Sequence, residues 1–87
     1  MNIQPLHGLT AQVQPQWGGL HLAARRVWLW QDEDNGGWWS VECPSLPGCI
    51  SQGETPEAAL QNIREAMEGW LTVTLEAGQP VPAADAR

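Results

Sequence analysis

Apolar residues recur at spacings of three and four between Thr55 and Gly78, a period that predicts one long amphipathic helix. The repeating positions are Leu60, Ile63, Met67, Trp70, Leu71 and Thr74. Thr55 suits the N-cap of this helix, Pro56 its first position and Gly78 a left-handed C-cap. Gly69 costs the helix about 1 kcal/mol relative to Ala, so we expect a close neighbour there, either the sheet or a partner subunit.

Alternating, β-branched and aromatic residues predict two strands that form a hairpin before this helix. The first runs from Leu20 to Trp30 and the second from Trp38 to Glu42, with an acidic, glycine-rich turn between them. We place Trp30 opposite Trp38, because a shift by one residue would bring Ser40 into the aliphatic face. One face then carries Val27, Leu29, Trp39 and Val41, and the other carries Trp28, Trp30 and Trp38 with Arg26, Ser40 and Glu42. We expect the helix to pack against the aliphatic face.

Two prolines and a glycine separate the hairpin from a third predicted strand. Pro44 and Pro47 lack backbone N–H groups and bias the residues before them toward extended dihedrals, so neither a helix nor a central ladder runs through them. Gly48 accepts a positive φ, which lets residues 49–51 begin a strand at once. The residues alone leave open whether this loop is more than a stiff connection.

The two ends of the chain carry weaker signals. Residues 9–13 alternate, so the leader formed by residues 1–19 is either disordered or an extra edge strand. We favour the strand, because the apolar residues of the leader, Trp17 included, would otherwise be exposed. After the helix, Val81 is expected to anchor a short strand on the sheet edge, and residues 83–87 are expected to fray.

The face with three tryptophans has no obvious cover in a domain with one long helix. Each aromatic side chain buries roughly 150–250 Å², and a contiguous exposed apolar patch usually marks an interface. We therefore predict a protein-binding or self-association surface at Trp28, Trp30 and Trp38. The alternative is that the leader around residues 9–17 folds back over these side chains.

Charge points to a protein partner. Ten acidic residues against four basic ones give a net charge of −6, which disfavours attraction to a polyphosphate backbone and favours a basic protein. Asp32, Glu33 and Asp34 lie in the hairpin turn, where a solvated loop is the default. The chain has neither a long apolar run nor a secretory signal, so we expect a cytoplasmic protein without a membrane span.

Catalytic and metal-binding patterns are missing from the sequence. Cys43 and Cys49 form no familiar zinc spacing with His7 and His21, and we interpret both cysteines as structural. Neither histidine stands beside a nucleophile in a catalytic pattern, and the chain has no glycine-rich phosphate loop. We expect no enzymatic activity, no cofactor and no bound metal.

The stretch from Glu42 to Ala66 combines a strand, a Pro-x-Leu-Pro-Gly-Cys turn, a short strand ending in glycine, and an alanine-rich helix that follows a threonine. The turn positions are Pro44, Leu46, Pro47, Gly48 and Cys49. This order resembles the HicB family of antitoxins. The resemblance implies a truncated RNase H-like fold that neutralises a small ribonuclease toxin, HicA, by binding it. Many members append a DNA-binding domain that this chain has no room for, so we expect no direct contact with nucleic acid.

The predicted architecture is an α+β domain over residues 20–82. It has an antiparallel three-stranded sheet, one long helix on one face and a short fourth edge strand, in the order strand, strand, strand, helix, strand. Its predicted partner is a HicA-type toxin, whose basic surface would meet Asp32, Glu33, Asp34 and Glu42. The three tryptophans would supply apolar contact or the seam of a homodimer or higher homo-oligomer. The alternative is an orphan homo-oligomeric structural or regulatory protein without a toxin.

Overall fold

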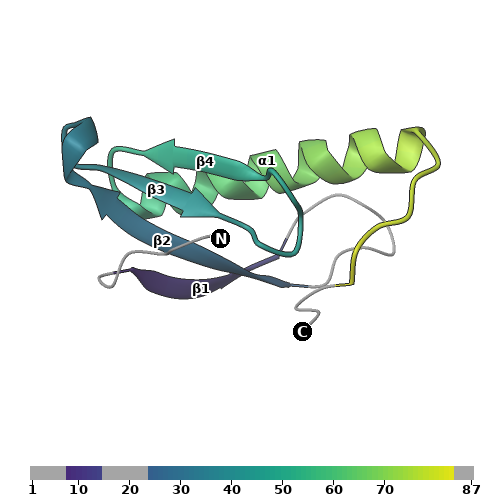
Figure 1. Ribbon diagram of the computed structural model, residues 1–87, viewed down its shortest axis with the longest axis horizontal. Coiled ribbons are helices and arrows are strands. Elements are labelled where there is room, and N and C mark those ends of the chain that lie inside the picture. Colours follow the sequence, from purple (N-terminus) through teal and green to yellow (C-terminus); the bar gives the residue numbers. More distant parts are fainter. Residues whose placement is uncertain (1–7, 15–23, 84–87) are drawn as a thin grey trace.

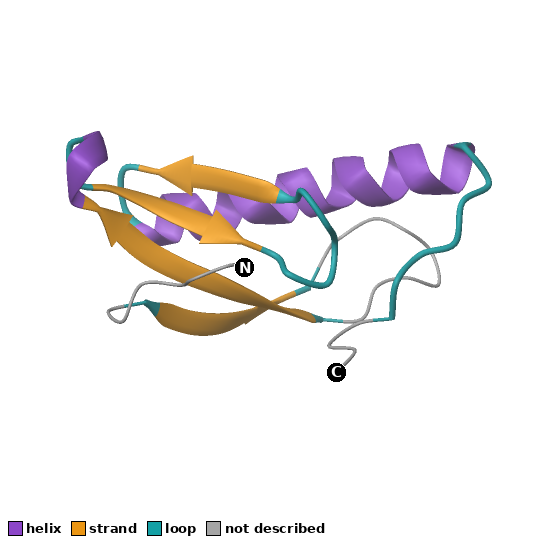
Figure 2. Cartoon of the chain, in the orientation of Figure 1, coloured by secondary structure: helices purple, strands orange, loops and turns teal. Residues whose placement is uncertain are grey.

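The computed structural model of the chain describes residues 8–14 and 24–83, which form an antiparallel sheet beside one long helix (Figure 1). The elements are β1 (Leu9–Val13), β2 (Arg25–Asp32), the 3-10 helix η2 (Glu33–Asn35), β3 (Trp38–Glu42), β4 (Ile50–Gly53) and α1 (Pro56–Glu76). The strands lie in the order β1-β2-β3-β4, and each neighbouring pair is antiparallel. The helix runs along the β4 side of the sheet, with β1 at the far edge (Figure 2). The predicted α+β class is confirmed, whereas the RNase H-like relationship stays a prediction.

The fourth strand comes from the N-terminal segment, so the sheet has four strands rather than three before the helix. β1 pairs with β2, with Val13 opposite Arg25, which confirms the extra edge strand predicted there. The predicted strand at Val81 is wrong, because no strand forms in the described residues after α1. The prolines on either side of Val81 supply no N–H groups for a ladder, and its side chain packs half-buried against the core instead. Trp17 lies outside the described residues.

The register of the central hairpin differs from the predicted one by two residues. Trp30 lies opposite Ser40 rather than Trp38, and β2 continues to Asp32. The turn is tight there because the Asp32 side chain accepts a hydrogen bond from the backbone of η2, while its main-chain oxygen accepts one of 3.0 Å from Gly37. Since side chains alternate along a strand, a shift by two leaves each residue on its predicted face.

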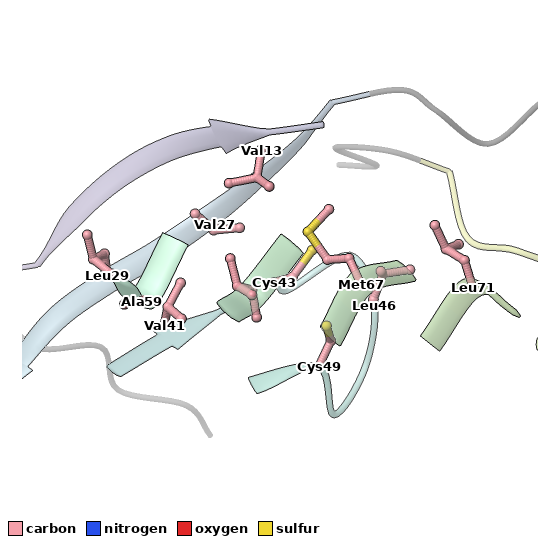
Figure 3. Packing of buried hydrophobic residues seen from close by; sticks show 11 residues of the cluster. Val13, Val27, Leu29, Val41, Cys43, Leu46, Cys49, Ala59, Met67 and Leu71 are labelled. Carbon is pink, nitrogen blue, oxygen red and sulfur yellow. The ribbon is translucent and has the colours of Figure 1, made fainter. Parts of the chain in front are cut away.

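The core lies between the aliphatic face of the sheet and the apolar stripe of α1 (Figure 3). Thr55 caps the helix by accepting a 3.0 Å hydrogen bond from the Ala58 N–H, and Gly78 takes a positive φ of 70° after the last turn, both as predicted. The fully buried side chains of the stripe and the sheet include Ile63, Met67, Leu71, Val27 and Val41. The loop between β3 and β4 adds Leu46 to this cluster. The predicted separation of an aliphatic face from a tryptophan face is confirmed.

Candidate functional site

The seven residues predicted to form a protein interface all lie on the hairpin of β2 and β3. β2 contributes Trp28, Trp30 and Asp32, η2 contributes Glu33 and Asp34, and β3 contributes Trp38 and Glu42. Alternation along the two strands places the three tryptophans, Asp32 and Glu42 on the face opposite α1. We call these five residues the tryptophan face, and Glu33 with Asp34 the acidic tip.

Indoles and carboxylates are paired across the tryptophan face. Trp28 lies opposite Glu42 at one end, and Trp38 lies opposite Asp32 at the other. Trp30 lies between these two pairs. Directly opposed side chains on neighbouring strands have their Cβ atoms about 4.5–5.5 Å apart, so the five residues form one patch. This patch suits a partner that offers apolar surface and basic groups side by side.

The three indoles are covered to different extents. Trp38 is 37% exposed, whereas Trp28 and Trp30 are half-buried. Gly8, just before β1, lies against Trp28, since a Cβ atom at Gly8 would overlap the indole ring. The Trp28 N–H is buried and has no acceptor among the described residues. In the described part of the leader, Gly8 therefore covers Trp28. Residues 15–17, the rest of the segment expected to cover this face, lie outside the described part of the chain.

The carboxylates at the end of the hairpin divide into two groups. Asp32 is half-buried, and its Oδ1 atom accepts a 3.1 Å hydrogen bond from the Asp34 N–H. The Asp32 carboxylate therefore shapes the turn. The side chains of Glu33 and Asp34 are exposed and accessible to a partner. The hairpin end that carries their helix, η2, lies at one end of the molecule (Figure 1).

The loop with the Pro-x-Leu-Pro-Gly-Cys motif is built into the core. Leu46 is fully buried, its N–H donates to the Cys43 oxygen at 3.0 Å, and its oxygen accepts from the Cys49 N–H at 2.9 Å. Gly48 has a φ of 83°, the positive value expected of it, and both prolines are exposed. Among the described residues the motif therefore closes one end of the hydrophobic core, and its geometry explains the sequence pattern without a ligand.

Arg25 has a structural role that the sequence interpretation missed. Its side chain is 2% exposed, and its Nη1 and Nη2 atoms donate to Ser45 Oγ at 2.9 Å and to the Pro82 oxygen at 2.7 Å. One guanidinium therefore joins β2 to the motif loop and to the chain after the helix. Strand alternation was the available signal, because Arg25 shares its parity with the buried Val27 and Leu29.

The two cysteines of the motif loop are both buried, and the pKa of one of them is shifted. Burial raises the pKa of the Cys49 thiol to about 11, with the neighbouring Cys43 adding to the shift and Arg25 opposing it. At neutral pH this thiol is protonated and is a poor nucleophile. Within residues 8–14 and 24–83, no three histidine, cysteine or acidic side chains gather as metal ligands. The same residues contain no helix long and apolar enough to cross a bilayer.

Comparison with known proteins assigns the chain to a family. The family described as the HicB-like antitoxin of bacterial toxin-antitoxin systems matches residues 27–86. The chain is 46% identical over 57 residues to a UPF0150 protein of Synechocystis, covering 66% of this chain and 71% of that protein. It is 38% identical over 56 residues to a UPF0150 protein of Thermoplasma acidophilum, covering 64% and 78% respectively.

No solved structure matches the chain. The family match nevertheless spans β3, β4 and α1 completely and begins within β2, so it covers the motif loop and most of the core. The chain belongs to the family of HicB-like antitoxins of bacterial toxin-antitoxin systems.

Proposed function

We propose that this protein neutralises a small, basic HicA-type toxin that cleaves mRNA, by covering it with the tryptophan face and the acidic tip. The observation that carries the proposal is the pairing of indoles with carboxylates, Trp28 with Glu42 and Trp38 with Asp32, on a face of the sheet outside the core. A protein that cleaves RNA needs basic groups to hold the phosphate backbone. Acidic groups beside an apolar patch match such a surface.

The acidic residues provide attraction at a distance. The chain has a net charge of −6, and Glu33 and Asp34 project from the end of the hairpin. Complementary charge raises the association rate and the specificity of a complex more than its affinity. The acidic tip therefore guides the toxin toward the tryptophan face.

The indoles provide contact area after the encounter. Tryptophan is enriched among the few residues that carry most of the binding energy of an interface. Trp38 is 37% exposed and contributes most readily, because it needs no rearrangement of the chain. Trp28 is held by Gly8 and supports the patch from one side.

The toxin is neutralised because the antitoxin occupies its RNA-binding surface. A toxin whose basic surface is covered cannot bind its mRNA, so the antitoxin itself breaks no bond and needs no cofactor. The negative charge of the chain also opposes its own contact with nucleic acid. The proposed site of action is the cytoplasm, where the mRNA substrate lies.

The test is binding to the basic protein encoded next to this gene, measured by calorimetry and by protection of mRNA from cleavage. Trp38→Ala should weaken binding by about 10- to 100-fold, the cost of a typical interface hot spot. The matched control is Leu75→Ala, which removes a 41% exposed apolar side chain from α1 and should change affinity less than about twofold. Equal affinity of the Trp38→Ala variant and the unmodified protein would contradict the proposed site. Failure to bind any adjacent basic protein would favour the orphan role.

The acidic tip is tested separately by association kinetics. The double substitution Glu33→Gln and Asp34→Asn preserves size and removes two negative charges. It should slow association about 10-fold at low ionic strength, and the difference should disappear at high salt because the Debye length falls. Association that is insensitive to salt in the unmodified protein would remove the acidic tip from the proposal.

A further inference from the structure

β4 is one of the two edge strands of the sheet, and its open side has backbone groups that no other strand covers. A hydrogen bond of 2.9 Å from the Cys43 N–H to the Cys49 oxygen puts these two residues at a hydrogen-bonded position of the ladder, next to the Glu42 and Ile50 pair, although the Cys49 N–H itself donates to Leu46. In an antiparallel ladder such pairs alternate with pairs whose backbone groups point away from each other. The N–H and C=O of Ile50 and of Gln52 therefore point away from β3, toward the open edge.

The Gln52 position is already engaged within the chain. The side-chain amide of Asn62 in α1 donates a 2.8 Å hydrogen bond to the Gln52 oxygen. The N–H and C=O of Ile50 together form the free position at which another strand can pair. β4 contains no charge, proline or bulge, the usual devices that keep an edge from pairing with another chain.

An apolar groove of about 570 Å³ lies beside this position. Its sheet side includes Gly48 and Ile50, and its helix side includes Ala66, Gly69, Trp70 and Val73. Ile50 is 60% exposed and Val73 is 66% exposed, the two highest values among the large hydrophobic residues of the described chain. Ile50 lines the groove and also carries the open backbone groups of β4, so the groove and the open edge form one continuous surface. Its side chain lies opposite Glu42, on the face of the sheet away from α1.

Gly69 is the residue that intrachain packing does not explain. A glycine in the middle of a helix is unfavourable, and the sequence led us to expect a close neighbour at this position. A Cβ atom built on Gly69 meets nothing within 4 Å, so no described residue of the same chain is that neighbour. The space that the missing side chain leaves belongs to the groove.

We infer that a second copy of this chain occupies this surface, with Ile50 pairing with its symmetry mate across a two-fold axis and the two α1 helices packing near Gly69. The occupant must offer an open strand edge and an apolar helix surface side by side. The chain itself presents an open strand edge beside an apolar helix surface. In a two-fold dimer the same patch of each copy meets the other, so one contact pairs the two strand edges and also packs the two helix surfaces.

The charge distribution also favours a second copy of this chain as the occupant. All groove residues are uncharged in a chain with a net charge of −6, and the acidic tip lies at the other end of the molecule (Figure 1). A neutral lining offers no complementary charge to a basic protein, and a two-fold contact near Gly69 keeps the two acidic tips apart. The resulting sheet carries both helices on one side and both tryptophan faces on the other, so each copy keeps its proposed toxin surface free.

The experiment is sedimentation equilibrium of the full chain across micromolar concentrations. The expected species has twice the 9.5 kDa mass of one chain. Gly69→Glu should shift it to the monomer, because the substitution places two carboxylates together at the axis. This variant keeps its fold, since glutamate favours the helix more than glycine does and the position is open in the monomer. Circular dichroism verifies the helix content.

The matched control is Gln61→Glu, the same new charge on an exposed position of α1 outside the groove, which should leave the dimer intact. Gly69→Arg should also be monomeric alone, and mixing it with Gly69→Glu should restore a species of double mass. A monomeric unmodified protein, or a Gly69→Glu variant that stays dimeric, would overturn the inference, as would a dimer abolished by Trp38→Ala but not by Gly69→Glu. Toxin binding by the Gly69→Glu monomer is expected to persist, which separates this inference from the proposed function.

Discussion

The indole N–H of Trp70 in α1 donates a 3.0 Å hydrogen bond to the main-chain oxygen of Pro47. The bond ties the second half of the helix to the motif loop between β3 and β4. It also holds Trp70 in place as one wall of the apolar groove. A single side chain therefore connects the most recognisable sequence motif with the surface that the sequence did not reveal.

Trp70→Phe should lower the free energy of unfolding by about 0.5–1.5 kcal/mol, because the ring still packs while the hydrogen bond to Pro47 is lost. Urea denaturation of dilute protein measures the change. The control is Trp38→Phe on the sheet, where the indole N–H makes no hydrogen bond among those described, and the expected change is within about 0.5 kcal/mol. Equal losses in the two variants would show that the bond to Pro47 adds no stability.

The two faces of the hairpin were predictable, while its register was not. Two residues of a strand share a face when their positions differ by an even number. The apolar residues Val27, Leu29 and Val41 follow this spacing, so the sequence showed which face is buried. The register depends on where the turn closes, and this was decided by the Asp32 side chain capping η2, a local contact among several equally acidic candidates. The five residues of the tryptophan face share one side of the sheet for the same reason, whereas Glu33 and Asp34 lie in η2. That these seven positions bind a partner stays a prediction.

The missed features are those that depend on contacts distant in sequence. Arg25 donates hydrogen bonds to Ser45 and Pro82, which are 20 and 57 positions away. No local sequence pattern predicts such distant partners. The strand expected at Val81 does not form, since Pro80 and Pro82 on either side supply no N–H groups for a ladder. The groove was signalled only by the cost of Gly69, which indicated a neighbour without saying which chain supplies it.

Gly53→Ala should lower the free energy of unfolding by about 1–3 kcal/mol. A Cβ atom there would lie 2.5 Å from the Ala59 nitrogen and 2.7 Å from the Ala58 carbonyl carbon, so the sheet and the first turn of α1 would have to separate. Chemical denaturation of dilute protein measures this. Gly69→Ala is the matched control, since its Cβ meets no atom, and it should stabilise the monomer by about 1 kcal/mol. Two changes of the same sign would contradict this account of the two glycines.

Leu46→Ala should lower the free energy of unfolding by about 2–5 kcal/mol, because it leaves a cavity at a fully buried position of the core. A motif loop that served only as an exposed binding element would lose far less stability. Leu75→Ala removes a similar side chain from a 41% exposed position and should cost less than about 0.5 kcal/mol. Toxin affinity of the folded Leu46→Ala fraction should match that of the unmodified protein, since the loop lies outside the tryptophan face.

Alkaline pH should reveal the burial of Cys49. Its pKa is raised from the ordinary value of 9.0 to about 11, so between these values the unfolded chain has released a proton that the folded chain keeps. The free energy of unfolding therefore stays level below pH 9 and falls as the pH rises toward 11.

The composition of the chain makes this window unusually clear. The sequence has no tyrosine, and its four basic residues are all arginine, so no tyrosine or lysine side chain masks the titration of the Cys49 thiol between pH 9 and 11. Urea denaturation at several pH values measures the slope. Cys49→Ala should reduce the slope, and an unchanged slope in that variant would mean that the Cys49 thiol is not protected in the folded protein.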